Sequence, residues 1–386
     1  MEFGFSEEQR MIRALVAAFV EKELMPHERL VEESGQVPHD LAADIKAKAL
    51  AAGIYAANMP AEWGGGGLDN LTLSLVEREL GKTAYGLHYI IARPSNILRA
   101  CTGEQVERYL LPTISGARVE CLAMSEPDAG SDLRGIKCRA VRDGGDYVIT
   151  GTKHFISHAD VADYVILFAR SGEEQHRGAT RPLITAFLVD MGTPSFEVLP
   201  GYRAVSHRGY HNFILSFDGC RVPDTQILGD EHNGFSVANT WLGSTRLQVA
   251  ATCLGRAERA LDLATEWAAR RHQFGQPIGK FQGVSFKLAD MALRLAAAEL
   301  LTYQAAWKAD QGTMTDSDAA MAKLYSTEML AFVTDEAIQV LGGMGLMDEL
   351  PLERMWRDAR VERIWDGTSE IQRHIISRAL LRPLGG

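Results

Sequence analysis

The chain has 386 residues, of which 46% are hydrophobic and 23% charged, which predicts a globular protein with two or three hydrophobic cores. Acidic residues outnumber basic ones by 50 to 40, and the net charge of −10 argues against binding of nucleic acid, which needs clustered Lys and Arg. The five cysteines form no C-x-x-C pair, so we expect reduced thiols in a cytoplasmic protein.

The first 120 residues are predicted to be helical. Ser6 and Gln9 have the spacing of a capping box, and apolar residues then recur at helical intervals. The start of the chain has no basic stretch followed by an apolar core, and no apolar run appears long enough to span a bilayer. We therefore expect neither a secretory signal nor a membrane span. Helix breaks are expected at Pro26, Pro38, Pro60, Pro94 and Pro112.

Residues 121–230 differ in composition, with short runs of β-branched and aromatic residues between Gly, Pro and Asp. Strands are predicted within 147–150, 164–168, 184–189 and 213–217, which together favour a small β-barrel or sandwich. From 231 to 386 the helical period returns, and apolar residues step by three and four along one predicted helix: Phe281, Val284, Leu288, Met291 and Leu295. The predicted fold class is therefore α+β, with an N-terminal helical domain (1–120), a central β domain (121–230) and a C-terminal helical bundle (231–386).

Most candidate motifs have an ordinary structural explanation. The glycine run at 64–67 is not followed by Gly-Lys-Ser/Thr, so a turn is favoured over a phosphate loop. Gly342, Gly343 and Gly345 follow a helix rather than a strand and so do not form a dinucleotide fingerprint. The eleven histidines include no metal-binding spacing, and no metal site is expected.

Three stretches are more informative in combination. Residues 124–132, Met-Ser-Glu-Pro-Asp-Ala-Gly-Ser-Asp, form a loop whose hydroxyl and backbone N–H groups suit a ring carbonyl or a phosphate. Residues 270–275, Arg-Arg-His-Gln-Phe-Gly, place basic, amide and aromatic groups between two long helices. In residues 363–373, Thr368 is a plausible helix N-cap and Glu370 suits the first turn, while the Asp366 carboxylate beside Trp365 suits a general base kept partly dry.

In this order and at these separations, the three stretches resemble the acyl-CoA dehydrogenase family over essentially the whole chain. The resemblance implies FAD as the cofactor, held between the β domain and the C-terminal bundle. It also implies the reaction, in which Asp366 removes the α-proton of an acyl-CoA thioester and the β-hydrogen leaves as a hydride to the flavin. The matched cofactor positions are Ser125, Ser131, Phe155, Ser157, Arg271, Phe274, Gln339, Gly343, Thr368 and Glu370.

The same resemblance implies substrate contacts and partners. Ser131 and Arg246 match substrate positions, and Arg93 and His88 lie in the stretch that often lines the acyl pocket. Arg93 could equally pair with surface acids at a helix end. Arg271 and Phe274 match positions that reach the FAD of a neighbouring subunit, so a homotetramer, or at least a dimer, is expected. An electron-transfer flavoprotein would accept the electrons.

Two departures from the family pattern concern the substrate. Most members carry glutamate where Asp366 stands, and a subgroup carries its base near Ser244 and Thr245, which are not carboxylates here. Aspartate is one methylene shorter, which withdraws its oxygens by roughly 1.5 Å. Family relatives that act on alicyclic acyl-CoA thioesters, or that oxidise nitroalkanes, use aspartate. A compact, branched or cyclic acyl group is therefore expected, with a nitroalkane oxidase or a non-catalytic flavin protein as alternatives.

Overall fold

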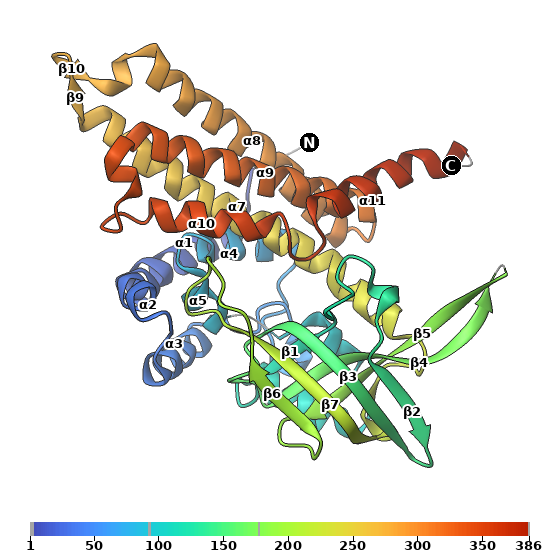
Figure 1. Ribbon diagram of the computed structural model, residues 1–386. Coiled ribbons are helices and arrows are strands. Elements are labelled where there is room, and N and C mark those ends of the chain that lie inside the picture. Colours follow the sequence, from blue (N-terminus) through green and yellow to red (C-terminus); the bar gives the residue numbers. More distant parts are fainter. Residues whose placement is uncertain (1–3, 92–93, 177, 385–386) are drawn as a thin grey trace.

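The computed structural model describes residues 4–91, 94–176 and 178–384, so Arg93 lies outside the described residues. The chain is arranged in three parts (Figure 1). A C-terminal helical bundle forms one layer, and the N-terminal helices and the central sheet lie side by side against it. The predicted α+β class, with its helical, β and helical order, is confirmed. The division at residues 120 and 230 stays a prediction.

The N-terminal helices are α1 (Glu7–Phe19), α2 (Glu28–Ser34), α3 (His39–Ala51), α4 (Asn70–Leu80), α5 (Tyr85–His88) and α6 (Leu111–Ile114). The predicted capping box is present, because Gln9 N donates to Ser6 Oγ at 3.1 Å and Ser6 N donates to Gln9 Oε1 at 3.0 Å. Pro38 immediately precedes α3 as expected. Pro26 and Pro112 instead lie within continuous helical stretches, each just after a π-helical segment, Val20–Leu24 and Val106–Leu110.

The sheet contains β1 (Glu120–Ala123), β2 (Arg139–Asp143), β3 (Asp146–Ser157), β4 (Tyr164–His176), β5 (Ala179–Asp190), β6 (Phe196–Pro200), β7 (Asn212–Pro223) and β8 (Ile227–Leu228). The strand order is β6-β7-β3-β2-β4-β5-β8, with β1 paired to β4. All four predicted strands fall inside β3, β4, β5 and β7. One core joins both halves of the sheet, since Tyr147 and Leu215 from one half and Val165 and Phe187 from the other belong to it. The predicted barrel or sandwich is thus one mixed sheet around a shared core.

The C-terminal bundle contains α7 (Gly234–Arg270), α8 (Gln282–Asp310), α9 (Asp316–Leu341), α10 (Leu352–Glu362) and α11 (Ser369–Leu381). The small hairpin β9 (His272–Gln273) and β10 (Gln276–Pro277) joins α7 to α8. On α8, Met291 and Leu295 are buried, and Val284 and Leu288 pack against the same core, as their spacing predicts. The β9–β10 hairpin stands at one end of the bundle, and α11 projects from the other (Figure 1).

One stretch of the bundle has the length and composition of a membrane span. Within the described residues this is Asp316–Leu346, which contradicts the expectation that no apolar run is long enough. Helix α9 forms most of the stretch and packs against α7, α8, α10 and α11. A core helix of a bundle has the same composition, so the stretch carries little weight as evidence for a membrane protein.

Close backbone contact joins the N-terminal helices to the bundle. A Cβ atom at Gly255 on α7 would stand 1.7 Å from the carbonyl oxygen of Arg78 on α4, so only glycine permits this crossing. The buried Glu28 of α2 adds a polar link, because it accepts hydrogen bonds from Arg259 of α7 at 2.7 Å and from Arg354 of α10 at 2.9 Å. Ala84 N, just before α5, also donates to Glu28 at 3.0 Å, so this carboxyl group links the start of α5 to α10, near the candidate site.

Candidate active site

Asp366 lies in the turn between α10 and α11. Its backbone is left-handed, with φ of 53°, and Gly367 follows with φ of 89°. A non-glycine residue rarely adopts this conformation, and such residues cluster at functional sites. Thr368 then caps α11, accepting a hydrogen bond from Ile371 N at 3.3 Å, and Glu370 occupies the first turn, both as predicted.

The Asp366 carboxyl group is partly buried and surrounded by polar groups from several helices. Burial raises its pKa to about 6, while the cations Lys323 and Arg246 and a hydrogen bond with Thr245 oppose that rise. At neutral pH the group is therefore mostly ionised, yet remains a stronger base than an ordinary aspartate. A subgroup of the resembled family carries its base near the position of Thr245. Because Thr245 hydrogen-bonds to Asp366, the two alternative positions for the base are neighbours in the folded chain.

Two buried side chains hold the backbone around Asp366. Lys323 Nζ, from α9, donates to the carbonyl oxygens of Trp365 and Gly367 at 2.9 Å each. Gln372 Nε2, from α11, donates to the carbonyl oxygens of Asp366 at 3.2 Å and Gly367 at 2.8 Å. The carbonyl groups of three successive residues thus accept hydrogen bonds from two fully buried side chains.

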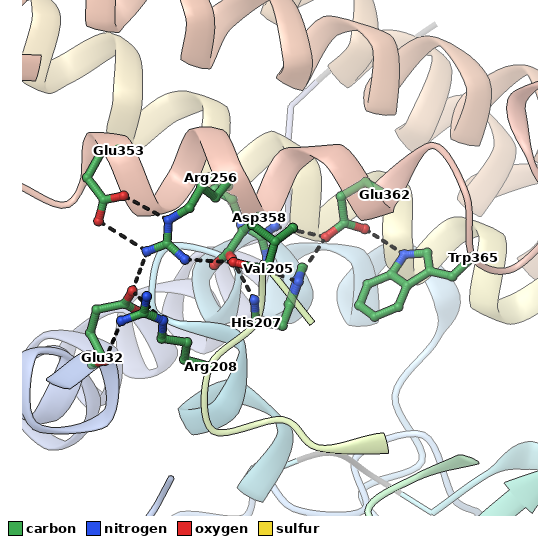
Figure 2. A network of polar contacts seen from close by, with 10 residues as sticks. Glu32, Val205, His207, Arg208, Arg256, Glu353, Asp358, Glu362 and Trp365 are labelled. Carbon is green, nitrogen blue, oxygen red and sulfur yellow. Dashed lines mark hydrogen bonds and ion pairs between the residues drawn. The ribbon is translucent and has the colours of Figure 1, made fainter. Parts of the chain in front are cut away.

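Trp365 is anchored by a buried charge network (Figure 2). Its Nε1 donates to Glu362 at 2.8 Å, and Arg256 Nη1 donates to the other oxygen of Glu362 at 2.8 Å. His207 Nε2 lies 3.5 Å from that oxygen, and His207 N donates to Asp358 at 2.7 Å. Although burial opposes ionisation, Arg256, His207 and Trp365 lower the pKa of Glu362 to about 2. Glu362 is thus a permanent anion that orients the indole.

Aromatic rings surround the base. Tyr85 of α5 lies 5.1 Å from Trp365 and 4.8 Å from Tyr210 between ring centroids, and Tyr89 lies 4.8 Å from Tyr210. His158 stacks on Tyr89 at 4.0 Å, and burial lowers the pKa of His158 to about 3, so this ring is neutral. Burial, together with negative neighbours that include Asp366, raises the pKa values of Tyr85 and Tyr210. The hydroxyl groups therefore stay protonated near Asp366.

The β domain contributes Phe155 and Ser157 on β3. The β3–β7 register shifts between Lys153 and Ile156, and at this irregularity Phe155 has φ of 55° and a side chain that is 55% exposed. A bulge commonly re-aims a side chain in this way. Ser157 hydrogen-bonds to Tyr210, so β3 connects directly to the aromatic rings near Asp366.

The loop that carries Ser125 and Ser131 is tied to the same strand. Glu126 is buried and accepts hydrogen bonds from Lys153 Nζ at 2.7 Å and Cys138 N at 3.0 Å. Ser125 O accepts from His154 N at 3.0 Å. Ser125 is half-buried and Ser131 is exposed. The loop therefore lies beside the C-terminal part of β3, which also carries the exposed Phe155.

A second group of predicted cofactor residues lies elsewhere. Arg271 and Phe274 belong to the β9–β10 hairpin, and Gln339 and Gly343 lie around the end of α9; all four are exposed, Phe274 to 93%. Arg246 and the hairpin are separated by most of α7, which at 1.5 Å per residue is about 36 Å. One chain therefore brings Asp366, Arg246, Ser157 and Thr368 together but keeps the hairpin at the far end of the bundle (Figure 1).

A polar hollow of about 360 Å³ opens beside the first turn of α7 and the β4–β5 hairpin. Its lining includes Arg134, Arg181, His232, Asn233 and Ser236. Glu174 also lines the hollow and lies 3.4 Å from Arg181, so the lining carries both signs of charge. Arg134 and the amide and hydroxyl groups suit phosphate oxygens.

Several residues of the site were not found from the sequence. Lys323 and Arg256 carry no local motif, because their partners lie far along the chain: Lys323 bonds residues 42 and 44 positions away, and Arg256 bonds a residue 106 positions away. Gln372 lies within the 363–373 stretch, but its hydrogen bonds to Asp366 and Gly367 were not predicted. His88, named for the acyl pocket, is buried with Nε2 3.1 Å from Glu77 and its ring 5.3 Å from Tyr85.

Three family models cover most of the chain in order. They are the N-terminal domain of acyl-CoA dehydrogenase over residues 6–117, its middle domain over 121–220 and its C-terminal domain over 232–381. Two curated relatives are similar along their whole length. A probable acyl-CoA dehydrogenase of Bacillus subtilis is 36% identical over 99% of this chain and 100% of its own. The mitochondrial short-chain specific acyl-CoA dehydrogenase of Bos taurus is 37% identical over 97% of this chain and 90% of its own.

Solved structures agree in fold. Butyryl-CoA dehydrogenase from Megasphaera elsdenii superposes with a TM-score of 0.89 at 34% identity, over 99% of this chain and 100% of the other. The FAD complex of PigA gives a TM-score of 0.92 at 29% identity, over 100% of both chains. A chain in the structure described as the electron-transferring flavoprotein of Acidaminococcus fermentans gives 0.88 at 33% identity, over 99% and 100%.

Proposed function

The chain belongs to the acyl-CoA dehydrogenase family, and we propose on that basis that it dehydrogenates an acyl-CoA thioester to the 2-enoyl-CoA, with Asp366 as the α-proton base. It is an oxidoreductase that acts on acyl-CoA. Asp366 is assigned as the base because of its surroundings. Its carboxyl group has a pKa of about 6 and lies beside Thr245, Arg246 and three aromatic rings.

FAD is the cofactor of this flavoprotein, and the residues present fit it. Phe155 offers an exposed aromatic face at a strand irregularity, and Ser125 and Ser157 place hydroxyl groups near the same part of β3. Thr368 and Glu370, at the N-terminus of α11, lie next to Asp366, where a helix start favours negative groups such as phosphate. When bound there, FAD supplies the acceptor for the hydride that leaves the β-carbon.

The residues of this chain perform the proton half of the reaction. The Asp366 carboxylate accepts the α-proton, and its raised pKa brings it closer to that weak carbon acid. Arg246 is buried near Asp366, and its Nε has no hydrogen-bond partner among the described residues, so a donor remains available for substrate. The surrounding rings exclude water from the carboxylate.

The acyl group is proposed to be compact, branched or cyclic. Tyr85, Tyr89, Tyr210 and Trp365 form an aromatic surface near Asp366 that suits a ring better than an extended chain. The shorter aspartate leaves more room beside the α-carbon than glutamate would. The coenzyme A portion is assigned to the polar hollow, where the guanidinium group of Arg134 suits its phosphates and Arg181, paired with Glu174, lies on the opposite strand of the hairpin.

The active enzyme is proposed to be a homo-oligomer, with a tetramer expected. The separation of Arg271 and Phe274 from Asp366 supports this, because one FAD could contact both groups only if they came from two chains. A second feature is an apolar stripe on α8, spaced by seven residues and more than half exposed along its length: Phe286, Leu293, Leu300 and Trp307. Such a stripe on a single chain marks an interface.

An electron-transfer flavoprotein is proposed as the electron acceptor, in line with the third structural neighbour. The test of the function is anaerobic mixing of the purified yellow protein with a panel of acyl-CoA thioesters and nitroalkanes while flavin absorbance is followed. Bleaching by a compact acyl-CoA is expected. Bleaching by nitroalkanes alone would favour a nitroalkane oxidase, and a protein that binds FAD but is bleached by neither would be a non-catalytic member.

A further inference from the structure

The backbone that presents Asp366 is held in an uncommon conformation by charge rather than by packing alone. Asp366 and Gly367 are consecutive left-handed residues, and for the aspartate this arrangement is unfavourable unless neighbouring groups enforce it. The enforcing groups are Lys323 on α9 and Gln372 on α11, which donate hydrogen bonds to the carbonyl groups of this turn. Both side chains are fully buried and so cannot contact substrate.

We propose that Lys323 is the positioning residue of the active site: its ammonium group fixes the carbonyl groups on both sides of Asp366 and sets the reach and charge of the base. The proposal rests on the proposed function of Asp366. Lys323 does two things that Gln372 does not. It binds the carbonyl groups of the residues before and after Asp366, and it lowers the pKa of the Asp366 carboxyl group.

The electrostatic surroundings of Asp366 make Lys323 its principal counter-charge. The groups that face the carboxyl are Lys323 from α9, Arg246 and Thr245 from α7, Glu362 from α10, and the Tyr85 and Tyr210 hydroxyls. Among those that lower the pKa of Asp366, Lys323 has the largest effect. Burial lowers the pKa of Lys323 itself, while the neighbouring carboxyl groups of Asp366 and Glu362 act in the opposite direction.

Glu362 cannot substitute for this role, since it is negative and engaged by Arg256 and Trp365 (Figure 2). Arg246 is the other cation, and it lies on the side proposed for substrate. Replacing Lys323 should therefore affect Asp366 in two separable ways: the loop loses its clamp, and the carboxylate loses its nearest buried positive charge.

Four variants of the holoenzyme separate these effects. Lys323→Met removes both donors and charge, Lys323→Gln keeps N–H donors without charge, and Lys323→Arg keeps both. Gln372→Met removes the neutral clamp. Lys287→Met is the matched control, because Lys287 pairs with Glu336 on the bundle surface away from Asp366. Each variant is first checked for FAD absorbance and oligomer size, and flavin reduction by acyl-CoA is then followed by rapid mixing across pH.

Lys323→Met should lower the reduction rate by about 10²-fold, the effect of misplacing a reacting group by about 1 Å. Its pH midpoint should move upward by about one unit, because a lost neighbouring cation favours the protonated acid. Lys323→Gln should show the same upward shift with a smaller loss of rate. Gln372→Met should lose rate without a shift, and Lys323→Arg should keep a midpoint close to that of the unaltered enzyme.

An infrared pH titration of the Asp366 carboxyl band, assigned by its absence in Asp366→Asn, measures the same shift without turnover. Wild-type rates and midpoints in both Lys323→Met and Lys323→Gln would overturn the proposal. If Lys323→Met does not accumulate as folded protein, the comparison of Lys323→Gln with Gln372→Met still tests the proposal. A shifted pH midpoint in Lys323→Gln alone would support the proposal, and an unshifted midpoint in Lys323→Gln would overturn it. Reduction of Asp366→Asn at the wild-type rate would instead refute the base assignment, so the two failures are distinguishable.

Discussion

Asp366 combines a left-handed backbone with a carboxyl group that several helices enclose. Burial raises its pKa to about 6 even though Lys323, Arg246 and Thr245 act in the opposite direction. The proposed chemistry needs the ionised form, which accepts the α-proton. A glutamate in the same turn would have the same neighbours but a longer reach, so the choice of aspartate bears on the substrate.

The first prediction concerns pH. Because protonated Asp366 cannot act as a base, kcat/KM should fall as the pH drops through about 6 and level off above it. Steady-state assays over this range, with enzyme stability checked at each pH, measure the profile of the free enzyme. A rate that is constant through this region would show that another group limits proton abstraction.

The second prediction concerns the length of the base. Asp366→Glu extends the side chain by roughly 1.5 Å, which should raise the ratio of kcat/KM for straight-chain over cyclic acyl-CoA. The longer side chain reaches the α-carbon of a slim substrate but crowds a ring against Tyr85 and Tyr210. Competition between one substrate of each kind gives the ratio directly. An unchanged preference would separate substrate choice from the length of the base.

The elements of the fold were largely predictable because their signals are local. The Ser6–Gln9 capping box, the β-branched runs of β3 to β5 and the apolar spacing on α8 depend on neighbouring residues. The Thr368 cap of α11 was recognised for the same reason. Lys323 and Arg256 were missed, since a buried lysine or arginine within a helix gains its role only from residues brought near by folding.

The third prediction tests the contact between α4 and α7. Gly255→Ala places a methyl group 1.7 Å from the Arg78 carbonyl oxygen, so the helices must separate, and a loss of about 1–3 kcal/mol of stability is expected. Thermal or denaturant unfolding measures the loss. Gly283→Ala on α8 is the control, since a Cβ there meets no atom within 4 Å. Equal stability of the two variants would mean that the crossing tolerates a side chain.

Among the described residues of the single chain, Phe274 on its hairpin is 93% exposed, and the apolar stripe on α8 is more than half exposed. The proposed oligomer accounts for both, because a second chain would cover the stripe and bring a hairpin to the cofactor. FAD retention and assembly should then depend on each other.

The fourth prediction follows from this dependence. Leu293→Glu puts a charge in the middle of the stripe and should shift the protein to smaller species with loss of FAD. Light scattering and flavin absorbance measure the two effects. Met11→Glu on α1, at a similarly exposed apolar residue, should change neither. A Leu293→Glu protein that keeps both its size and its FAD would place the interface elsewhere.

The central claim is that Asp366 abstracts the proton in a flavin-dependent acyl-CoA dehydrogenation. Asp366→Asn keeps the size of the side chain and removes its basicity, and Asp335→Asn on the exposed side of α9 serves as the control. Anaerobic rapid mixing of FAD-loaded Asp366→Asn with a compact acyl-CoA should show flavin reduction slowed by about 10² to 10⁴-fold, with the control unaffected. Reduction of Asp366→Asn at the rate of the unaltered enzyme would contradict the account.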